Sequence, residues 1–233
     1  MTANVKEALE KIQSCDIFEK HPLYFVGGTA LAYHLGHRVS EDIDIVSNAL
    51  LPHKEIVSAI SKIGGIKLRD EHASSLRIAG LFPDEYMLKF NLDGVKVEFF
   101  KASTAIQNSI ISTAVITKYH DSALSLLDVE SIAKLKLVAL LSRKKSRDLF
   151  DFQTVLQKNI LTPKEIVETA SGSTKAICHL EDLYQFILQA EQPLDDEVVY
   201  LDELKPTVLS WDEIKEETLL RLSHLMDKAD KYA

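Results

Sequence analysis

The first half of the chain alternates short apolar runs with turn residues, a pattern typical of a small mixed sheet. Apolar runs predict strands at 23–28 and 42–48, and the stretch between them predicts a short helix that stops at Gly36. The segment 51–65, which has a proline near its start and two glycines at its end, predicts a longer helix. Further strands are predicted at 75–82, 86–93 and 95–102.

The dipeptide Asp93-Gly94 separates the last two of these runs. Asp-Gly between β-rich runs is the strongest short signal for a hairpin, because both residues tolerate positive φ. We therefore expect an antiparallel pair here, within a mixed sheet flanked by helices that extends to about residue 105.

The second half of the chain is dominated by helical periodicity, which begins with a continuous pattern over 128–158. Capping-box sequences at Thr162 and Ser210 predict the starts of two later helices. The segment 191–210 contains two prolines and many acids, so we expect an exposed loop there. The sequence thus predicts an α+β chain with a sheet lobe over 1–118 and a helical lobe over 119–233.

Composition and charge exclude some classes of function for this protein. The 233 residues carry a formal net charge of -8, so the protein as a whole is not a polyanion binder and any nucleic-acid contact has to be local. Cys15 and Cys178 lie far apart and match no metal or redox spacing, which favours a reducing compartment. No apolar run approaches the roughly 20 residues of a membrane span. We expect a cytoplasmic protein that does not contact the membrane.

Two carboxylates lie at alternate positions of the predicted strand 42–48. Asp42 and Asp44 would project from one face, and like charges so close repel unless a cation or a shared proton relieves them. Oxygen ligands favour magnesium or manganese. Glu98 would join them if its strand pairs beside theirs, which would give a metal site of the type used for phosphoryl transfer. The alternative is that all three acids are solvated strand residues.

A glycine pair precedes the predicted helix before these acids. The amides of Gly27 and Gly28, with the helix N-terminus and the Thr29 hydroxyl, could hold a phosphate oxygen. The alternative is a tight turn from strand to helix with no ligand.

Three cations of the second half follow helical spacing. If one helix runs through this segment, Lys136, Arg143 and Arg147 point within about 20° of one direction. Such a row could neutralise a triphosphate, and Asp151, four residues after Arg147, could fix that arginine by an ion pair. The alternative is a solvated basic face with an ordinary helix ion pair.

Together these motifs resemble a known family. The first motif resembles that of the AbiEii/AbiGii toxin-type nucleotidyltransferases, a branch of the DNA polymerase β-like superfamily; it comprises Gly27, Gly28, Thr29, Leu31, Arg38, Ser40, Asp42, Ile43 and Asp44. Glu98 matches the carboxylate on a later strand that completes the family's metal site. A second motif is similar at Lys136, Ala139, Arg143, Arg147, Asp148, Leu149 and Asp151. The resemblance covers about residues 23–152.

The resemblance implies a nucleotidyltransferase-type mixed sheet followed by a helical lobe. It implies Mg²⁺-dependent, or Mn²⁺-dependent, transfer of a nucleoside monophosphate from a nucleoside triphosphate to an acceptor hydroxyl, with RNA such as tRNA suspected. Asp42, Asp44 and Glu98 would bind metal, and Lys136 would act beside them.

The same resemblance suggests roles for the remaining residues of the two motifs. Nucleotide and phosphate would contact Gly27, Gly28, Thr29, Arg38, Ser40, Arg143 and Arg147, with Asp148 and Asp151 in support. Arg38 and Ser40 could instead orient the Asp42-Asp44 strand.

The resemblance further implies a bacterial toxin of a toxin–antitoxin or phage-defence pair, with a cognate antitoxin protein as partner. The alternative function is a nucleotide-binding or antitoxin-partner module that keeps the fold without turnover.

Overall fold

The computed structural model describes residues 1–69, 73–203 and 208–230, in two compact units. The first unit comprises residues 1–34 and 40–128, and the second comprises 35–39 and 129–233. The sequence pattern suggested a change of character after residue 118. In the structure residues 119–128 stay with the first unit, because strand β7 (Ser125–Leu127) pairs with β1 (Tyr24–Val26).

The first unit is built on a mixed sheet. In the described part of the chain, seven strands lie in the order β3-β4-β5-β2-β1-β7-β6, with β2/β5 and β1/β7 parallel and the other neighbours antiparallel. Its other strands are β2 (Asp42–Ser47), β3 (Ile66–Lys67), β4 (Met87–Leu92), β5 (Val95–Lys101) and β6 (Ile116–Lys118). Its helices are α1 (Ala3–Ile12), α2 (Ile17–Lys20), α3 (Gly27–Leu35), α4 (His53–Lys62), α5 (Ala73–Ile78), η1 (Pro83–Glu85) and α6 (Ala105–Thr113).

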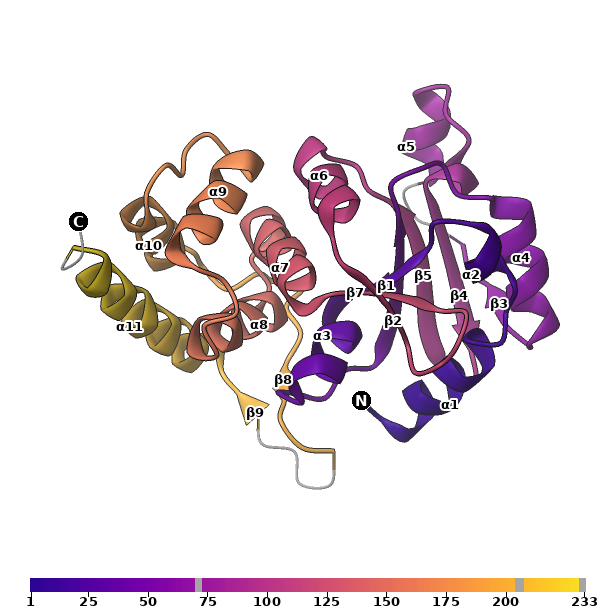
Figure 1. Cartoon of the computed structure of the whole chain (residues 1–233), viewed down its shortest axis with the longest axis horizontal. Coiled ribbons are helices and arrows are strands. Elements are labelled where there is room, and N and C mark those ends of the chain that lie inside the picture. The colour runs from indigo at the N-terminus through magenta and orange to yellow at the C-terminus, as the bar shows by residue number, and fades with distance from the viewer. Residues whose placement is uncertain (70–72, 204–207, 231–233) are drawn as a thin grey trace. The chain divides into compact units, whose positions relative to one another are not determined.

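One face of this sheet carries the apolar core of the first unit. Ile43, Ile45 and Phe99 are fully buried, and Phe18 of α2 stacks on Phe99 with ring centroids 6.4 Å apart. Helices α1, α2 and α4 lie along this side of the sheet (Figure 1). Because strand side chains alternate, residues 42, 44 and 98 project from the opposite face.

The strand predictions of the first half are confirmed with one exception. Asp93 and Gly94 have φ of 52° and 84° and join β4 to β5, as the hairpin signal indicated. The predicted strand over 75–82 is wrong, since residues 73–78 form the short helix α5 and none of them is buried. Short apolar runs do not distinguish strand from helix, and no strand within the described residues pairs with the segment.

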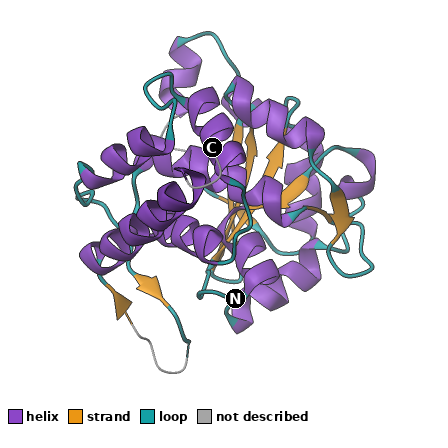
Figure 2. Cartoon of the chain, turned by 60° about the vertical axis from the view of Figure 1, so that its left-hand side comes forward, coloured by secondary structure: helices purple, strands orange, loops and turns teal. Residues whose placement is uncertain are grey.

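The second unit is a helical bundle with a short two-stranded ribbon (Figure 2). It contains α7 (Val129–Arg143), α8 (Ser146–Gln157), α9 (Pro163–Ser173), α10 (Leu180–Leu188), α11 (Trp211–Asp230), β8 (Val199–Tyr200) and β9 (Val208–Leu209). The capping boxes predicted at Thr162 and Ser210 are both present, with Glu165 and Glu213 as their partners.

Two predictions for the second half need correction. The helical pattern over 128–158 is divided at Lys144, which has a φ of 52° and separates α7 from α8. The segment predicted as a loop over 191–210 contains the β8/β9 ribbon, and its residues 204–207 lie outside the described part of the chain. Among the described helices, none has the length and apolar character needed to span a membrane.

Candidate active site

Three carboxylates share one face of the first unit's sheet. Strands β2 and β5 are parallel, and Asp44 lies directly opposite Glu98 in their register. Asp42 precedes Asp44 by two residues, so it projects from the same face. The Asp42 and Glu98 side chains keep 33% and 18% of their surface exposed. The expected pairing of the two strands is therefore present, and the three acids lie on neighbouring strands.

A lysine that the sequence reading missed lies among these acids. Lys96 is opposite Asp42 in the register, and its Nζ lies 3.6 Å from Asp42 Oδ2 and 3.1 Å from Glu98 Oε2. Burial lowers the pKa of Lys96, but the charges of Glu98 and Asp42 outweigh that effect and leave the pKa raised. Lys96 therefore stays cationic at neutral pH. The alternation in "VKVEFF" could have revealed it, since residues 96 and 98 share a face.

The carboxylates have the chemistry of a divalent-metal site. A single cationic atom, Lys96 Nζ, already reaches acids from both strands, and carboxylate oxygens suit Mg²⁺ or Mn²⁺. As described, residues 1–69, 73–203 and 208–230 contain no three Asp, Glu, His or Cys side chains arranged to ligate an ion. Here the carboxylates contact lysines instead, and Lys89 Nζ lies 3.7 Å from Glu98 Oε1. The residue types and the register of the two strands suit a divalent metal, and metal binding here stays a prediction.

The structure explains why residue 27 is a glycine. Helix α3 begins at Gly27, directly after β1, with φ of 78°. A Cβ on Gly27 would lie only 2.0 Å from Asp44 Oδ2. A larger residue at 27 would therefore displace the Asp44 carboxylate as well as strain the backbone.

The hydroxyl groups of Thr29 and Ser40, two residues of the first motif, form hydrogen bonds inside the fold. Thr29 is fully buried, and its hydroxyl lies 2.8 Å from Ser40 Oγ and donates to the backbone carbonyl of Asp42. Ser40 is 5% exposed. In this geometry both residues hold the start of β2, so they support the position of Asp42 instead of facing a ligand.

The second motif forms a buried ionic network within the second unit. Asp151, fully buried, accepts two hydrogen bonds from Arg38, at 2.7 Å from Nε and 3.0 Å from Nη2. His37 Nε2 lies 2.7 Å from the same carboxylate, and Lys136 Nζ lies 2.8 Å from it. Lys136 also contacts Asp148 at 3.1 Å. Residues from the 35–39 segment, α7 and α8 are thereby joined.

The charges of this network stabilise one another. Burial alone would raise the pKa of Asp151, but Arg38 and Lys136 hold it well below its usual range. For the same reason the pKa of Asp148 is lowered, by Lys136 and Arg143, despite burial. Burial lowers the pKa of Lys136, but Asp151 and Asp148 leave it raised. All of these groups are ionised at neutral pH.

The predicted single row of Lys136, Arg143 and Arg147 is wrong. Arg143 is the last residue of α7, whereas Arg147 lies on α8 beyond the break. Arg147 pairs with Glu197, at 2.9 Å, and not with Asp151 as expected from their spacing. Arg143 pairs with Asp148, with 2.9 Å between Nη2 and Oδ1. The helix break changes the direction of every residue after it, so spacing along the sequence could not give these partners.

The predicted site residues therefore form two groups. The first unit holds Gly27, Gly28, Thr29, Ser40, Asp42, Asp44 and Glu98, and the second holds Arg38, Lys136, Arg143, Arg147, Asp148 and Asp151. That the cations of the second group serve the acids of the first stays a prediction.

Comparison with known proteins agrees with this fold and these motifs. A family model described as "Nucleotidyl transferase AbiEii toxin, Type IV TA system" matches residues 13–216. An uncharacterized protein of Aquifex aeolicus, aq_aa25, is 25% identical over 202 residues, which is 83% of this chain and 89% of that protein.

Two solved structures share the fold. The crystal structure of JHP933 from Helicobacter pylori superposes with a TM-score of 0.52 at 17% identity and covers 97% of this chain and 92% of that chain. A Helicobacter pylori structure described as a "putative nucleotidyltransferase" gives 0.53 at 16% identity, with 100% and 99% covered. From the family match over most of its length, the chain belongs to the AbiEii family, the nucleotidyl transferase toxins of type IV toxin–antitoxin systems.

Proposed function

We propose that the protein transfers a nucleoside monophosphate from a nucleoside triphosphate to an acceptor hydroxyl, with Mg²⁺ or Mn²⁺ bound and pyrophosphate released. The observation that carries this proposal is the register of β2 and β5, which sets Asp44 opposite Glu98 with Asp42 on the same face. Membership of a nucleotidyl transferase family supports it.

Each residue of the first unit's site has a role in this reaction. Asp42, Asp44 and Glu98 would hold the metal, which when bound supplies positive charge to the reacting phosphate and lowers the pKa of the acceptor hydroxyl. Gly27 leaves room for the Asp44 carboxylate. Gly28 and the N-terminal amides of α3 would bind the outer phosphates of the nucleotide. Thr29 and Ser40 fix the start of β2 beneath Asp42.

We further propose RNA as the acceptor and a cognate antitoxin protein as the partner. The family is one of toxin–antitoxin systems, which supports the second point. A toxin with this chemistry acts by modifying a cellular component, and an RNA 3′ end offers the free hydroxyl that the reaction needs.

The test is to incubate the protein with each labelled nucleoside triphosphate, Mg²⁺ and total RNA. We expect one or more labels in RNA, with pyrophosphate released and no transfer after chelation of the metal.

Asp44→Asn should lower the rate roughly 10³-fold or more, whereas Asp16→Asn, which changes an exposed acid of the same unit, should have no effect. Metal-dependent nucleotide binding without transfer would instead support the non-catalytic module, and Asp44→Asn with full activity would refute the site.

A further inference from the structure

Lys96 lies between the two strands that carry the predicted metal ligands. Its Nζ is 3.1 Å from Glu98 Oε2, on its own strand, and 3.6 Å from Asp42 Oδ2, on β2. Asp42 is opposite Lys96 in the register of β2 and β5, and Glu98 follows two residues later on the same face. One ammonium group therefore contacts two of the three acids proposed to hold a divalent ion.

The contacts of Lys96 are exchangeable because they lie near solvent. The Lys96 side chain is 43% exposed, and those of Asp42 and Glu98 are 33% and 18% exposed. Partly exposed ion pairs change an equilibrium constant by up to about fivefold. A lysine ammonium group is carried on a flexible stem, so it can turn to another anion while the strand stays in place. Lys96 can thus leave the acids and remain at the site.

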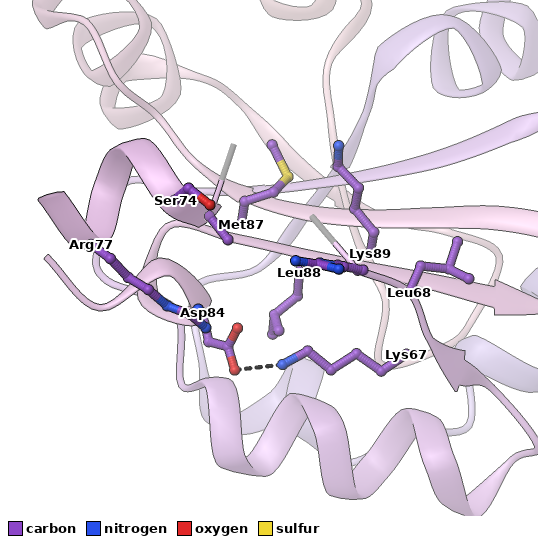
Figure 3. Close-up of a pocket in the computed structure, with 10 residues that line it drawn as sticks. Lys67, Leu68, Ser74, Arg77, Asp84, Met87, Leu88 and Lys89 are labelled. Carbon is purple, nitrogen blue, oxygen red and sulfur yellow. Dashed lines mark hydrogen bonds and ion pairs between the residues drawn. The ribbon is translucent and has the colours of Figure 1, made fainter. Parts of the chain in front are cut away.

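A second lysine stays beside Glu98 when Lys96 turns away. Lys89 lies opposite Glu98 in the register of β4 and β5, and its Nζ is 3.7 Å from Glu98 Oε1. Its side chain leaves β4 on the side opposite to Leu88, which is buried (Figure 3). Each carboxylate oxygen of Glu98 thus has a lysine near it. Loss of the Lys96 contact leaves Glu98 with a cation near its other oxygen.

Lys96 and a divalent ion require the same carboxylate oxygens. Lys96 loses both contacts when an ion occupies the oxygens of Asp42 and Glu98, because two cations on one pair of carboxylates repel each other. Without nucleotide, metal binding therefore costs the two ion pairs of Lys96. With a nucleoside triphosphate bound through the metal, the phosphate oxygens offer Lys96 a new anionic partner.

We infer that Lys96 couples metal binding to nucleotide binding, because it pairs with Asp42 and Glu98 in the unloaded protein and with nucleotide phosphates in the loaded one. The inference rests on the proposed transfer reaction and adds a residue that belongs to neither sequence motif. Such coupling is reciprocal, so metal raises the affinity for nucleotide by the same factor as nucleotide raises the affinity for metal.

The experiment measures this coupling on the full chain without turnover. Mn²⁺ is titrated by electron paramagnetic resonance. Of the four α,β-methylene nucleoside triphosphates, the one that the wild type binds most tightly is titrated by calorimetry, in EDTA and at saturating Mn²⁺. The ratio of the two nucleotide affinities gives the coupling factor, and the affinity of Mn²⁺ for free nucleotide cancels when variants are compared.

Lys96→Met should change the two affinities in opposite directions. Its affinity for Mn²⁺ alone should rise about fivefold, and its affinity for nucleotide at saturating Mn²⁺ should fall about fivefold. Nucleotide affinity in EDTA should stay within about twofold of the wild type, since Lys96 is then paired with the acids.

Two variants control the experiment. Lys101→Met removes a lysine from the other face of β5 and should bind Mn²⁺ and nucleotide like the wild type. Lys96→Arg keeps the positive charge and should retain most of the coupling. Unchanged nucleotide affinity of Lys96→Met at saturating Mn²⁺ overturns the inference, and so does an equal loss in Lys101→Met. A lower affinity of Lys96→Met for Mn²⁺ alone, or an equal loss of nucleotide affinity with and without Mn²⁺, overturns it as well.

The inference and the transfer reaction fail in different ways. Coupling that depends on Lys96, in a protein that transfers no nucleotide, leaves the role of Lys96 intact and refutes the reaction. Transfer activity in a protein whose coupling is the same in wild type and Lys96→Met refutes the inference and leaves the reaction intact.

Discussion

The carboxylate face of the first unit and the ionic network of the second use the same residue types in opposite ways. Asp42, Asp44 and Glu98 are partly exposed acids, and the ammonium groups of Lys96 and Lys89 lie 3.1 to 3.7 Å from carboxylate oxygens of Asp42 and Glu98. Asp148 and Asp151 are fully buried and contact their arginine and lysine partners at 2.5 to 3.1 Å.

This difference indicates which charges are available to a ligand. A buried ion pair that loses one partner leaves an uncompensated charge, so removing one member of the second unit's network should destabilise the fold. Partly exposed acids of like charge repel one another, so a metal that takes the place of a lysine also relieves this repulsion. Lys136 is buried between Asp148 and Asp151, whereas the side chain of Arg143, which pairs with Asp148, is 56% exposed. We expect the partly exposed acids of the first unit to be more open to exchange than this buried lysine.

The same substitution in the two regions should have opposite effects on stability. Asp151→Asn should lower the free energy of unfolding by about 3 to 5 kcal/mol, because Arg38 and Lys136 lose a buried counter-charge. Urea unfolding followed by the fluorescence of Trp211, the single tryptophan, reports on the second unit. Asp44→Asn should leave the thermal midpoint equal or higher, because it relieves repulsion between acids. A destabilising Asp44→Asn with a neutral Asp151→Asn would reverse the comparison.

Gly27→Ala should have the second-largest effect on stability, because it displaces the Asp44 carboxylate. The new Cβ would lie 2.0 Å from Asp44 Oδ2, on a backbone with φ of 78°. We expect a loss of about 2 to 3 kcal/mol in unfolding free energy and a loss of metal binding, measured by Mn²⁺ titration. Gly94→Ala is the matched control, since φ is 84° there and nothing lies within 4 Å of its Cβ. An equal loss in both variants would attribute the effect to backbone strain alone.

Lys96→Met should raise the affinity for Mn²⁺ about fivefold. The variant removes the ammonium group that contacts Asp42 and Glu98, and half-exposed ion pairs contribute up to about 1 kcal/mol. Mn²⁺ binding is measured by electron paramagnetic resonance on the full chain. Lys101→Met, on the same strand but on its other face, should bind Mn²⁺ like the wild type. A weaker affinity in Lys96→Met would show that the lysine supports the metal site instead of competing with it.

The smallest expected effect is on the acid stability of the second unit. Hydrogen bonds from Lys134 and Thr162 lower the pKa of Glu165 from 4.5 to about 2. A lowered folded-state pKa contributes stability that is complete above about pH 4.5 and is lost as the pH falls toward 2. Glu165→Gln should flatten part of this dependence when unfolding is followed by Trp211 fluorescence. Other acids of the second unit whose pKa values are also lowered contribute to the rest of this dependence; they are Asp148, Asp151, Asp182, Asp196 and Glu213. An unchanged pH profile would contradict this assignment.

Sequence periodicity determined much of the fold because its causes are local. The Asp93-Gly94 turn and the Thr162 capping box depend on residues within one turn of each other, and both are present. The alternation of acidic and apolar residues at 42–45 predicts a strand, and β2 covers Asp42–Ser47. The strand predicted over 75–82 is wrong because the conformation of this segment depends on whether a neighbouring strand pairs with it, and none of the strands in the described part of the chain does.

For the candidate site, the sequence by itself determined which residue types are present and that Asp42 and Asp44 share a face. Only the tertiary structure decided that β2 pairs with β5 in the register that sets Asp44 opposite Glu98, and that Lys96 lies between the acids. It also decided that Asp151 binds Arg38, 113 residues away, and not Arg147. Periodicity fixes the direction of a side chain within one element. Strand register and the break at Lys144 arise from packing between distant segments, which spacing along the chain does not contain.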